Sequence, residues 1–217
     1  MPADSARRYD APMTLELLLV AVCLSVAVAM APWRTLRASG LQSPWLACLV
    51  LLPWLWAAQR ALPGGVVLQM SGACLLVLMF GWPLAVLSLV PITLAGALIA
   101  GSGVAHAIAT LAWNGVLPAT LALALGLATR RWLPHHLFVY ILGRGFIVTA
   151  LAITAAGALE VAWQPLPPGT ELEGLLLGHF LMSWGEAFVT GMFTAIFVAF
   201  KPEWLASWSD RRYLLRE

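Results

Sequence analysis

Charged residues are scarce in this chain. Asp, Glu, Lys and Arg make up 10% of its 217 residues, and hydrophobic residues make up 61%. A soluble globular domain carries about 25% charged residues. The mean hydropathy of +0.88 points the same way. The composition therefore excludes a soluble protein and predicts an all-α polytopic membrane bundle with lipid as its surroundings. The formal charge of +2, with basic residues scattered between apolar runs, implies no nucleic-acid partner.

Motifs for cofactors and catalysis are also lacking. The three cysteines lie in separate apolar runs without C-x-x-C spacing, which favours buried thiols over a disulfide framework or a zinc site. No G-x-x-x-x-G-K-[ST], H-E-x-x-H or G-x-S-x-G sequence is found. We therefore expect no enzyme and no permanently bound cofactor. An intramembrane hydrolase is the least favoured alternative, because its only Ser, His and Glu set shares one helix face.

Apolar runs long enough for membrane helices follow one another along the chain. They predict seven spans, at about 13–32, 43–59, 66–80, 82–100, 103–128, 136–159 and 175–200. The count is open around the third and fourth runs, because only Gly81-Trp82-Pro83 separates them. We expect one domain, with a polar segment at 1–12, the helical bundle at 13–200 and a cytoplasmic interfacial tail at 201–217.

Basic residues in the connections predict the orientation. With the N-terminus outside, the inner side receives eight of them and the outer side three. Because positive charge is enriched on the cytoplasmic side, the chain is predicted to be N-out and C-in, as a multi-pass protein of the cell's inner (plasma) membrane. The tail is expected to be a short helix with Trp and Tyr at headgroup depth.

Two stripes of polar residues cross the apolar spans. The last span places His179, Ser183, Glu186, Thr190 and Thr194 on one helical face, and the fifth places Ser102, His106, Thr110 and Asn114 at steps of four. A charge at the centre of a membrane helix costs about 2.5 to 3.5 kcal/mol on insertion scales, so each requires a reason. Arg144 and Glu186 are opposite charges on the last two spans and are expected to pair. The pair either fixes helix register or closes the floor of a polar cavity.

Four segments resemble one family of membrane proteins. They are Leu62-Pro63-Gly64-Gly65 to Gln69-Met70-Ser71-Gly72, Phe80-Gly81-Trp82-Pro83-Leu84-Ala85, Trp113-Asn114-Gly115-Val116-Leu117-Pro118, and Gly185-Glu186-Ala187-Phe188-Val189-Thr190-Gly191. Together they resemble the CbiM/NikM-type membrane subunits of energy-coupling-factor cobalt and nickel importers, over roughly residues 62–200. The resemblance implies an ABC-type importer that works with separate ATPase and transmembrane coupling subunits.

Two departures fall on the metal site of that family. Pro2 follows Met1 where the family has a His, and Gln69 stands where it has another His. An amide oxygen is a poor nickel or cobalt ligand beside imidazole, so the site of the family is not carried over. If a transition-metal cation is the substrate, we expect His106, His179 and Glu186 as its ligands. Gln69, Asn114 and Ser183 would then orient these ligands through hydrogen bonds without touching the ion.

Two functions from different classes follow. The first is a permease or substrate-binding component of such an importer, for a transition-metal cation. The second is a membrane accessory or scaffold protein of the same fold without transport activity.

Overall fold

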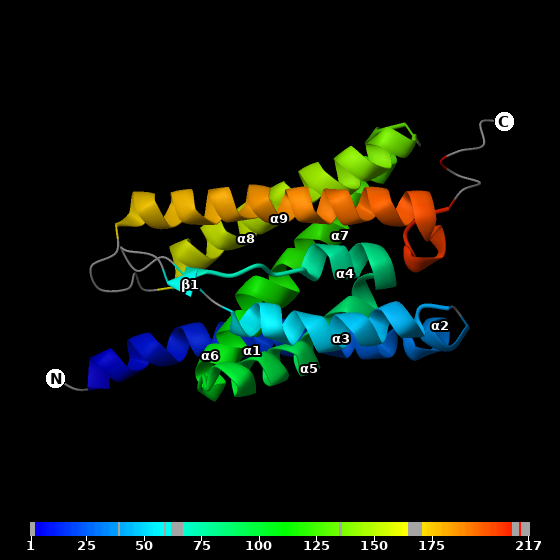
Figure 1. The fold of residues 1–217 in the computed structure, drawn as a ribbon. Coiled ribbons are helices and arrows are strands. Elements are labelled where there is room, and N and C mark those ends of the chain that lie inside the picture. Colours follow the sequence, from blue (N-terminus) through cyan, green and yellow to red (C-terminus); the bar gives the residue numbers. More distant parts are fainter. Residues whose placement is uncertain are drawn as a thin grey trace.

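The computed structural model describes residues 3–38, 40–58, 60–61, 67–134, 136–164, 171–209 and 213. Most of them lie in helices that run along a common direction and form one bundle (Figure 1). The elements are α1 (Ala3–Ala29), α2 (Trp33–Ala38), α3 (Gln42–Ala57), β1 (Arg60–Ala61), β2 (Val67–Leu68), α4 (Ala73–Phe80), α5 (Trp82–Ala100), α6 (Val104–Thr110), the π-helix η1 (Leu111–Val116), α7 (Leu117–Trp132), the π-helix η2 (Val139–Ile147), α8 (Val148–Trp163), α9 (Leu172–Phe200) and the 3-10 helix η3 (Pro202–Trp204).

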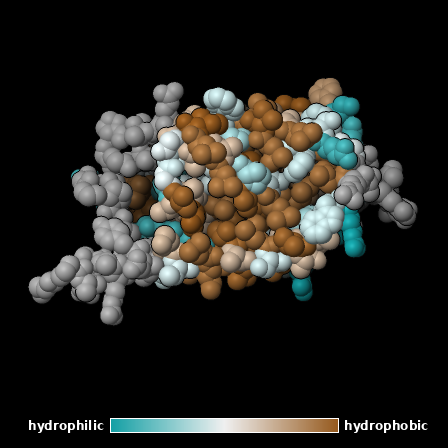
Figure 2. Space-filling view, turned by 90° about the horizontal axis from the view of Figure 1, so that it is seen from below, coloured by the Kyte–Doolittle hydropathy of each residue, from teal (hydrophilic) through white to brown (hydrophobic). Residues whose placement is uncertain are grey.

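In the part of the chain that the structure describes, four continuous helical stretches are long and apolar enough to cross a membrane. They are Trp82–Ala100, Val104–Trp132, Val139–Trp163 and Leu172–Phe200. The predicted all-helical fold class is confirmed at this level, and the number of seven spans stays a prediction. In α1 the apolar stretch Met13–Ala29 is shorter, and α3 has 16 residues. Hydrophobic residues cover the middle of the face in Figure 2, as expected of a surface in contact with lipid acyl chains.

The third predicted span, 66–80, is not one helix. Residues 69–72 have no helical structure, and α4 has only eight residues. At 1.5 Å per residue α4 is about 12 Å long, too short to cross a bilayer. The segment before α4 lies between the helices of the bundle (Figure 1). Hydropathy predicted a span because it measures how apolar a run is and not where its backbone leaves the helix.

The two ends of the bundle differ in charge. α1 begins at one end, and α9 finishes at the other, where α2 also lies (Figure 1). That second end carries Arg34 in α2 and Lys201 after α9, whereas Glu171 and Glu173 lie at the start of α9. This distribution agrees with the count of basic residues in the sequence. The orientation relative to the cytoplasm stays a prediction.

The described part of the tail, residues 201–209 and 213, differs from the predicted interfacial helix. Among these residues, η3 is the only helix longer than one residue. Leu205, Trp208 and Tyr213 are buried in the core. The backbone N–H of Ala206 donates to the Met79 carbonyl at 2.9 Å. The tail folds against the end of α4 because the last carbonyls of that helix need donors from elsewhere.

The cysteines are unpaired, as expected from their spacing. Cys23 and Cys74 are buried and Cys48 is half-buried, and all three are free. The residues predicted to share one face of α9 point inward, since Ser183, Glu186, Thr190 and Thr194 are all buried.

Candidate functional site

Glu186 holds the non-helical segment in the middle of the bundle. Its carboxylate accepts hydrogen bonds from the backbone N–H of Ser71 at 2.6 Å and of Gly72 at 2.7 Å. The side chain is 1% exposed. These two N–H groups lie just before α4, where the first amides of a helix have no partner within the helix. A carboxylate there is favoured both by hydrogen bonding and by the helix dipole.

The hydroxyl and the carbonyl of Ser71 also have hydrogen-bond partners. The Ser71 hydroxyl donates to the Asn114 carbonyl at 2.5 Å and accepts from the Ala73 N–H at 3.1 Å. The Trp56 indole N–H donates to the Ser71 carbonyl at 2.8 Å. Non-helical backbone is tolerated at membrane depth only where protein or water satisfies it. Gly72 has a φ of +68°, a conformation that side chains with a Cβ rarely adopt.

The expected ion pair between Arg144 and Glu186 is not formed. Glu186 bonds to backbone amides, and the Arg144 guanidinium instead donates to the Tyr213 hydroxyl at 3.4 Å. Among the described residues the structure has one salt bridge. It joins the exposed side chains of Lys201 and Glu203, with 3.4 Å between Nζ and Oε1. The partners of Glu186 are backbone amides that an interrupted helix leaves unpaired. A sequence shows which side chains are charged, but it does not show which amides lack a partner.

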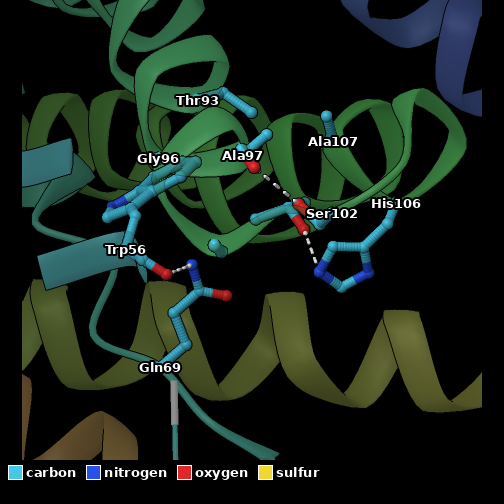
Figure 3. Close-up of a pocket in the computed structure, with 10 residues that line it drawn as sticks. Trp56, Gln69, Thr93, Gly96, Ala97, Ser102, His106 and Ala107 are labelled. Atoms are coloured by element: carbon cyan, nitrogen blue, oxygen red, sulfur yellow. Dashed lines mark hydrogen bonds between the residues drawn. The ribbon is translucent and has the colours of Figure 1, made fainter. Parts of the chain in front are cut away.

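A pocket of about 230 Å³, including space open to solvent, adjoins this segment. Gln69 reaches it from the chain before α4 and His106 from α6 (Figure 3). The Gln69 amide donates to the Trp56 carbonyl at 3.2 Å, and His106 Nε2 lies 3.5 Å from the Thr110 hydroxyl. Trp56 also lines the pocket, and the other lining residues are small or hydroxyl-bearing, among them Thr93, Gly96, Ala97 and Ser102. The pocket therefore offers an imidazole, an amide and hydroxyls, and no carboxylate among its lining residues.

The three proposed metal ligands do not converge. His106 is exposed on α6, which packs against η1, α1 and α5. His179 is on α9, which packs against α8, η2 and α4. Among the described residues there is no group of three His, Cys, Asp or Glu side chains placed to hold a metal ion. The predicted site assumed that the two polar stripes face each other, and the packing of α6 and α9 on different neighbours separates them.

His179 has a packing contact instead of a ligand geometry. A Cβ added to Gly157 of α8 would lie 2.6 Å from His179 Nδ1. The imidazole thus fills the space that this glycine leaves between α8 and α9. Close contact at a small residue is the usual way in which membrane helices approach each other.

The three residues expected to orient the metal ligands, Gln69, Asn114 and Ser183, are dispersed. Gln69 lines the pocket, and the backbone carbonyl of Asn114 receives the Ser71 hydroxyl. Ser183 donates to the Phe180 carbonyl at 2.7 Å, and its hydroxyl lies 2.6 Å from that of Thr154 on α8. Ser183 therefore joins α8 to α9 away from the pocket lining.

A second buried acid, Glu16, was missed in the sequence. It lies on α1 and is 3% exposed, and it accepts from the Trp113 indole N–H at 2.8 Å and from the Gln164 amide. Its position four residues into the first apolar run was the available signal. An acid at that depth requires a partner just as Glu186 does.

Comparisons with known proteins do not place the chain in a family. No protein-family description, no curated protein and no solved structure matches it. The resemblance to cobalt and nickel importer subunits thus rests on the short segments in the sequence. Three of those segments meet in the structure, where Ser71 contacts both Asn114 and Glu186.

Proposed function

We propose that this chain is a substrate-binding membrane subunit of an importer. One observation carries the proposal: an apolar pass is interrupted inside the bundle at residues 69–72, and Gln69 of this interruption lines a pocket. Gln69 and Trp56 connect the pocket to the interruption. Both line the pocket, the Gln69 amide donates to the Trp56 carbonyl, and the Trp56 indole N–H donates to the Ser71 carbonyl. Discontinuous helices are a recurring feature of substrate sites in transporters.

The pocket, and not the amino end of α4, is the proposed capture site. Glu186 already accepts from the amides before α4, so those amides are unavailable to a solute. The pocket offers hydrogen-bonding side chains from Gln69, Ser102 and His106, and no carboxylate. Such a lining suits a small polar solute, and a single imidazole can contribute one bond to a transition-metal cation.

A transition-metal cation is the finer form of the proposal. It rests on the resemblance to cobalt and nickel importers and on His106. The remaining ligands would have to be water or hydroxyl and amide oxygens, which bind such ions weakly compared with several imidazoles. Energy would come from separate ATPase and coupling subunits, because this sequence has no phosphate-binding loop of its own.

The alternative is an accessory or scaffold protein, and one observation favours it. Glu186 is 1% exposed, and both of its carboxylate oxygens accept hydrogen bonds that join α9 to the segment before α4. Its role in the structure is to hold the fold together, which a scaffold also requires.

Equilibrium binding to the purified protein tests the proposal. Cobalt, nickel, copper and zinc would be titrated into wild type, His106→Ala and Gln69→Ala, with His136→Ala as the control. His136 is an exposed histidine outside the pocket. We expect stoichiometric binding of at least one ion by wild type and the control, weakened in both pocket variants. Substoichiometric metal in wild type would reject the cation, and binding unchanged by either pocket substitution would reject the pocket.

A further inference from the structure

We propose that Trp56 is a positioning residue of the pocket and that it couples ligand binding there to the hydrogen bonds of Glu186. The inference rests on the proposed function, since it concerns the regulation of the same pocket. Trp56 is the last residue but one of α3 and is 3% exposed. It lines the pocket, whereas Glu186 is not among the lining residues.

Trp56 holds the interrupted segment at two points. Its backbone carbonyl accepts a hydrogen bond from the Gln69 side-chain amide at 3.2 Å (Figure 3). Its indole N–H donates to the Ser71 carbonyl at 2.8 Å. The first contact holds the side chain that reaches the pocket, and the second anchors the backbone two positions further on. The position of Trp56 therefore sets the position of Gln69.

The Trp56 side chain meets a glycine at each end. A Cβ added to Gly96 of α5 would lie 3.2 Å from the Trp56 Cβ, and one added to Gly115 of η1 would lie 3.2 Å from Trp56 Cη2. Gly96 is itself a lining residue of the pocket. Because these contacts are close, the indole cannot turn freely, and a shift of Trp56 is passed on to its hydrogen-bond partners.

One peptide group connects Trp56 to Glu186. The carbonyl of the Ser71–Gly72 peptide accepts from the Trp56 indole at 2.8 Å. The N–H of the same peptide, that of Gly72, donates to Glu186 Oε1 at 2.7 Å. Donation to the carbonyl polarises the peptide and strengthens its N–H as a donor, so the two bonds support each other. The Ser71 N–H, which donates to Glu186 Oε2 at 2.6 Å, belongs to the preceding peptide. The Trp56 bond thus acts directly on one of the two Glu186 contacts.

Binding in the pocket and the Glu186 contacts are therefore linked. A ligand that contacts Gln69 favours the arrangement in which Trp56 also holds the Ser71–Gly72 peptide against Glu186. By reciprocity, weakening the Glu186 contacts lowers the fraction of molecules that hold Gln69 in place, and the apparent affinity falls with it. Discontinuous helices at transporter substrate sites provide the movable element that such coupling requires.

Amide exchange in the metal-free protein, followed by NMR in detergent, tests the connection between Trp56 and Gly72. Trp56→Phe keeps an aromatic ring and the backbone carbonyl but removes the indole N–H donor. Trp45→Phe is the matched control, because Trp45 lies in the same helix and its indole donates to Ser88 Oγ at 2.7 Å, outside the pocket lining. We expect the Gly72 amide to exchange about fivefold faster in Trp56→Phe, the loss typical of one neutral hydrogen bond. The Ser71 amide should change less, and neither amide should change in Trp45→Phe.

Equilibrium binding of cobalt, nickel, copper and zinc tests the link to the pocket. Trp56→Phe and Glu186→Gln should each weaken binding by about fivefold, although Glu186 does not line the pocket. Independent effects would multiply to about 25-fold in the double variant. Because both substitutions act through one peptide group, the double variant should lose clearly less than that. Trp45→Phe should bind as wild type does.

Equal Gly72 exchange in Trp56→Phe and Trp45→Phe would overturn the inference, whether or not metal binds. Metal affinity unchanged in Trp56→Phe and Glu186→Gln, or independent losses in the double variant, would overturn it as well. Absence of metal binding by wild type would reject the cation of the proposed function, and Gly72 exchange would then decide the inference alone. If Trp56→Phe does not fold, Gln69→Ala takes its place. Removing the amide that bonds to Trp56 should speed Gly72 exchange, and an unchanged rate would overturn the inference.

Discussion

The Glu186 carboxylate accepts a hydrogen bond from the backbone N–H of Gly72 at 2.7 Å, although 114 positions separate the two residues. This contact joins α9 to the non-helical segment in the middle of the bundle. It explains why an acid lies at a position that is 1% exposed in an apolar helix. The free energy of folding therefore depends on Glu186 through backbone amides and not through a basic side chain.

A double-mutant cycle distinguishes these two kinds of partner. Among the described residues Glu186 and Arg144 share no hydrogen-bond partner, so Glu186→Gln and Arg144→Gln should change the free energy of unfolding independently. We expect their effects to add within about 0.5 kcal/mol in the double variant. Denaturant unfolding in detergent measures all four proteins. A coupling energy well above that limit would restore the ion pair that the sequence suggested.

Gly72→Ala should destabilise the protein more than Gly101→Ala. Both glycines have a positive φ, +68° and +67°, so each substitution should cost about 1 to 2 kcal/mol of backbone strain. Only at Gly72 would the new Cβ also approach Leu52 Cδ2, at 2.9 Å, while nothing lies within 4 Å at Gly101. The melting temperatures of the two variants provide the comparison. Equal decreases would show that Leu52 does not restrict the space at Gly72.

Gly157→Ala should disturb the packing of α8 on α9. Its Cβ would lie 2.6 Å from His179 Nδ1, and such overpacking typically costs about 1 to 3 kcal/mol. Gly185→Ala on the exposed side of α9 is the control, since nothing lies within 4 Å of it. Removing the imidazole in the Gly157→Ala, His179→Ala double variant should recover part of the loss in melting temperature. No recovery would mean that His179 does not fill this space.

Ser207→Ala should loosen the tail from α4. The Ser207 hydroxyl donates to the Leu78 carbonyl at 2.8 Å and lies 2.7 Å from the Tyr140 hydroxyl. Losing these hydrogen bonds should lower the free energy of unfolding by about 1 kcal/mol and make the tail more sensitive to protease. Ser209→Ala, at an exposed position, is the comparison. Identical proteolysis rates for the two variants would contradict a docked tail.

The sequence predicted those features that depend on the period and length of apolar runs. The inward stripe of α9 follows from spacing, because Ser183, Glu186 and Thr190 must share a face of any α-helix. The long helices follow from hydropathy in the same way. Free cysteines follow from their distribution.

Features that depend on which groups meet in three dimensions were not predictable in this way. A residue pattern does not reveal that the backbone leaves the helix at residues 69–72, and it was the amides freed there that bound Glu186. The candidate metal site failed for a related reason. His106 and His179 each lie on a predicted stripe, but stripes specify a face of one helix and not its neighbour.

Amide exchange at Ser71 and Gly72, followed by NMR on the detergent-solubilised protein, tests the role of Glu186 most directly. In wild type both amides should exchange slowly, like those inside α4, because each donates to a buried carboxylate. In Glu186→Gln one acceptor oxygen is lost, so at least one of the two should exchange about tenfold faster or more, while amides in α5 are unchanged. Rapid exchange of both amides in wild type, or rates unaffected by the substitution, would contradict the account.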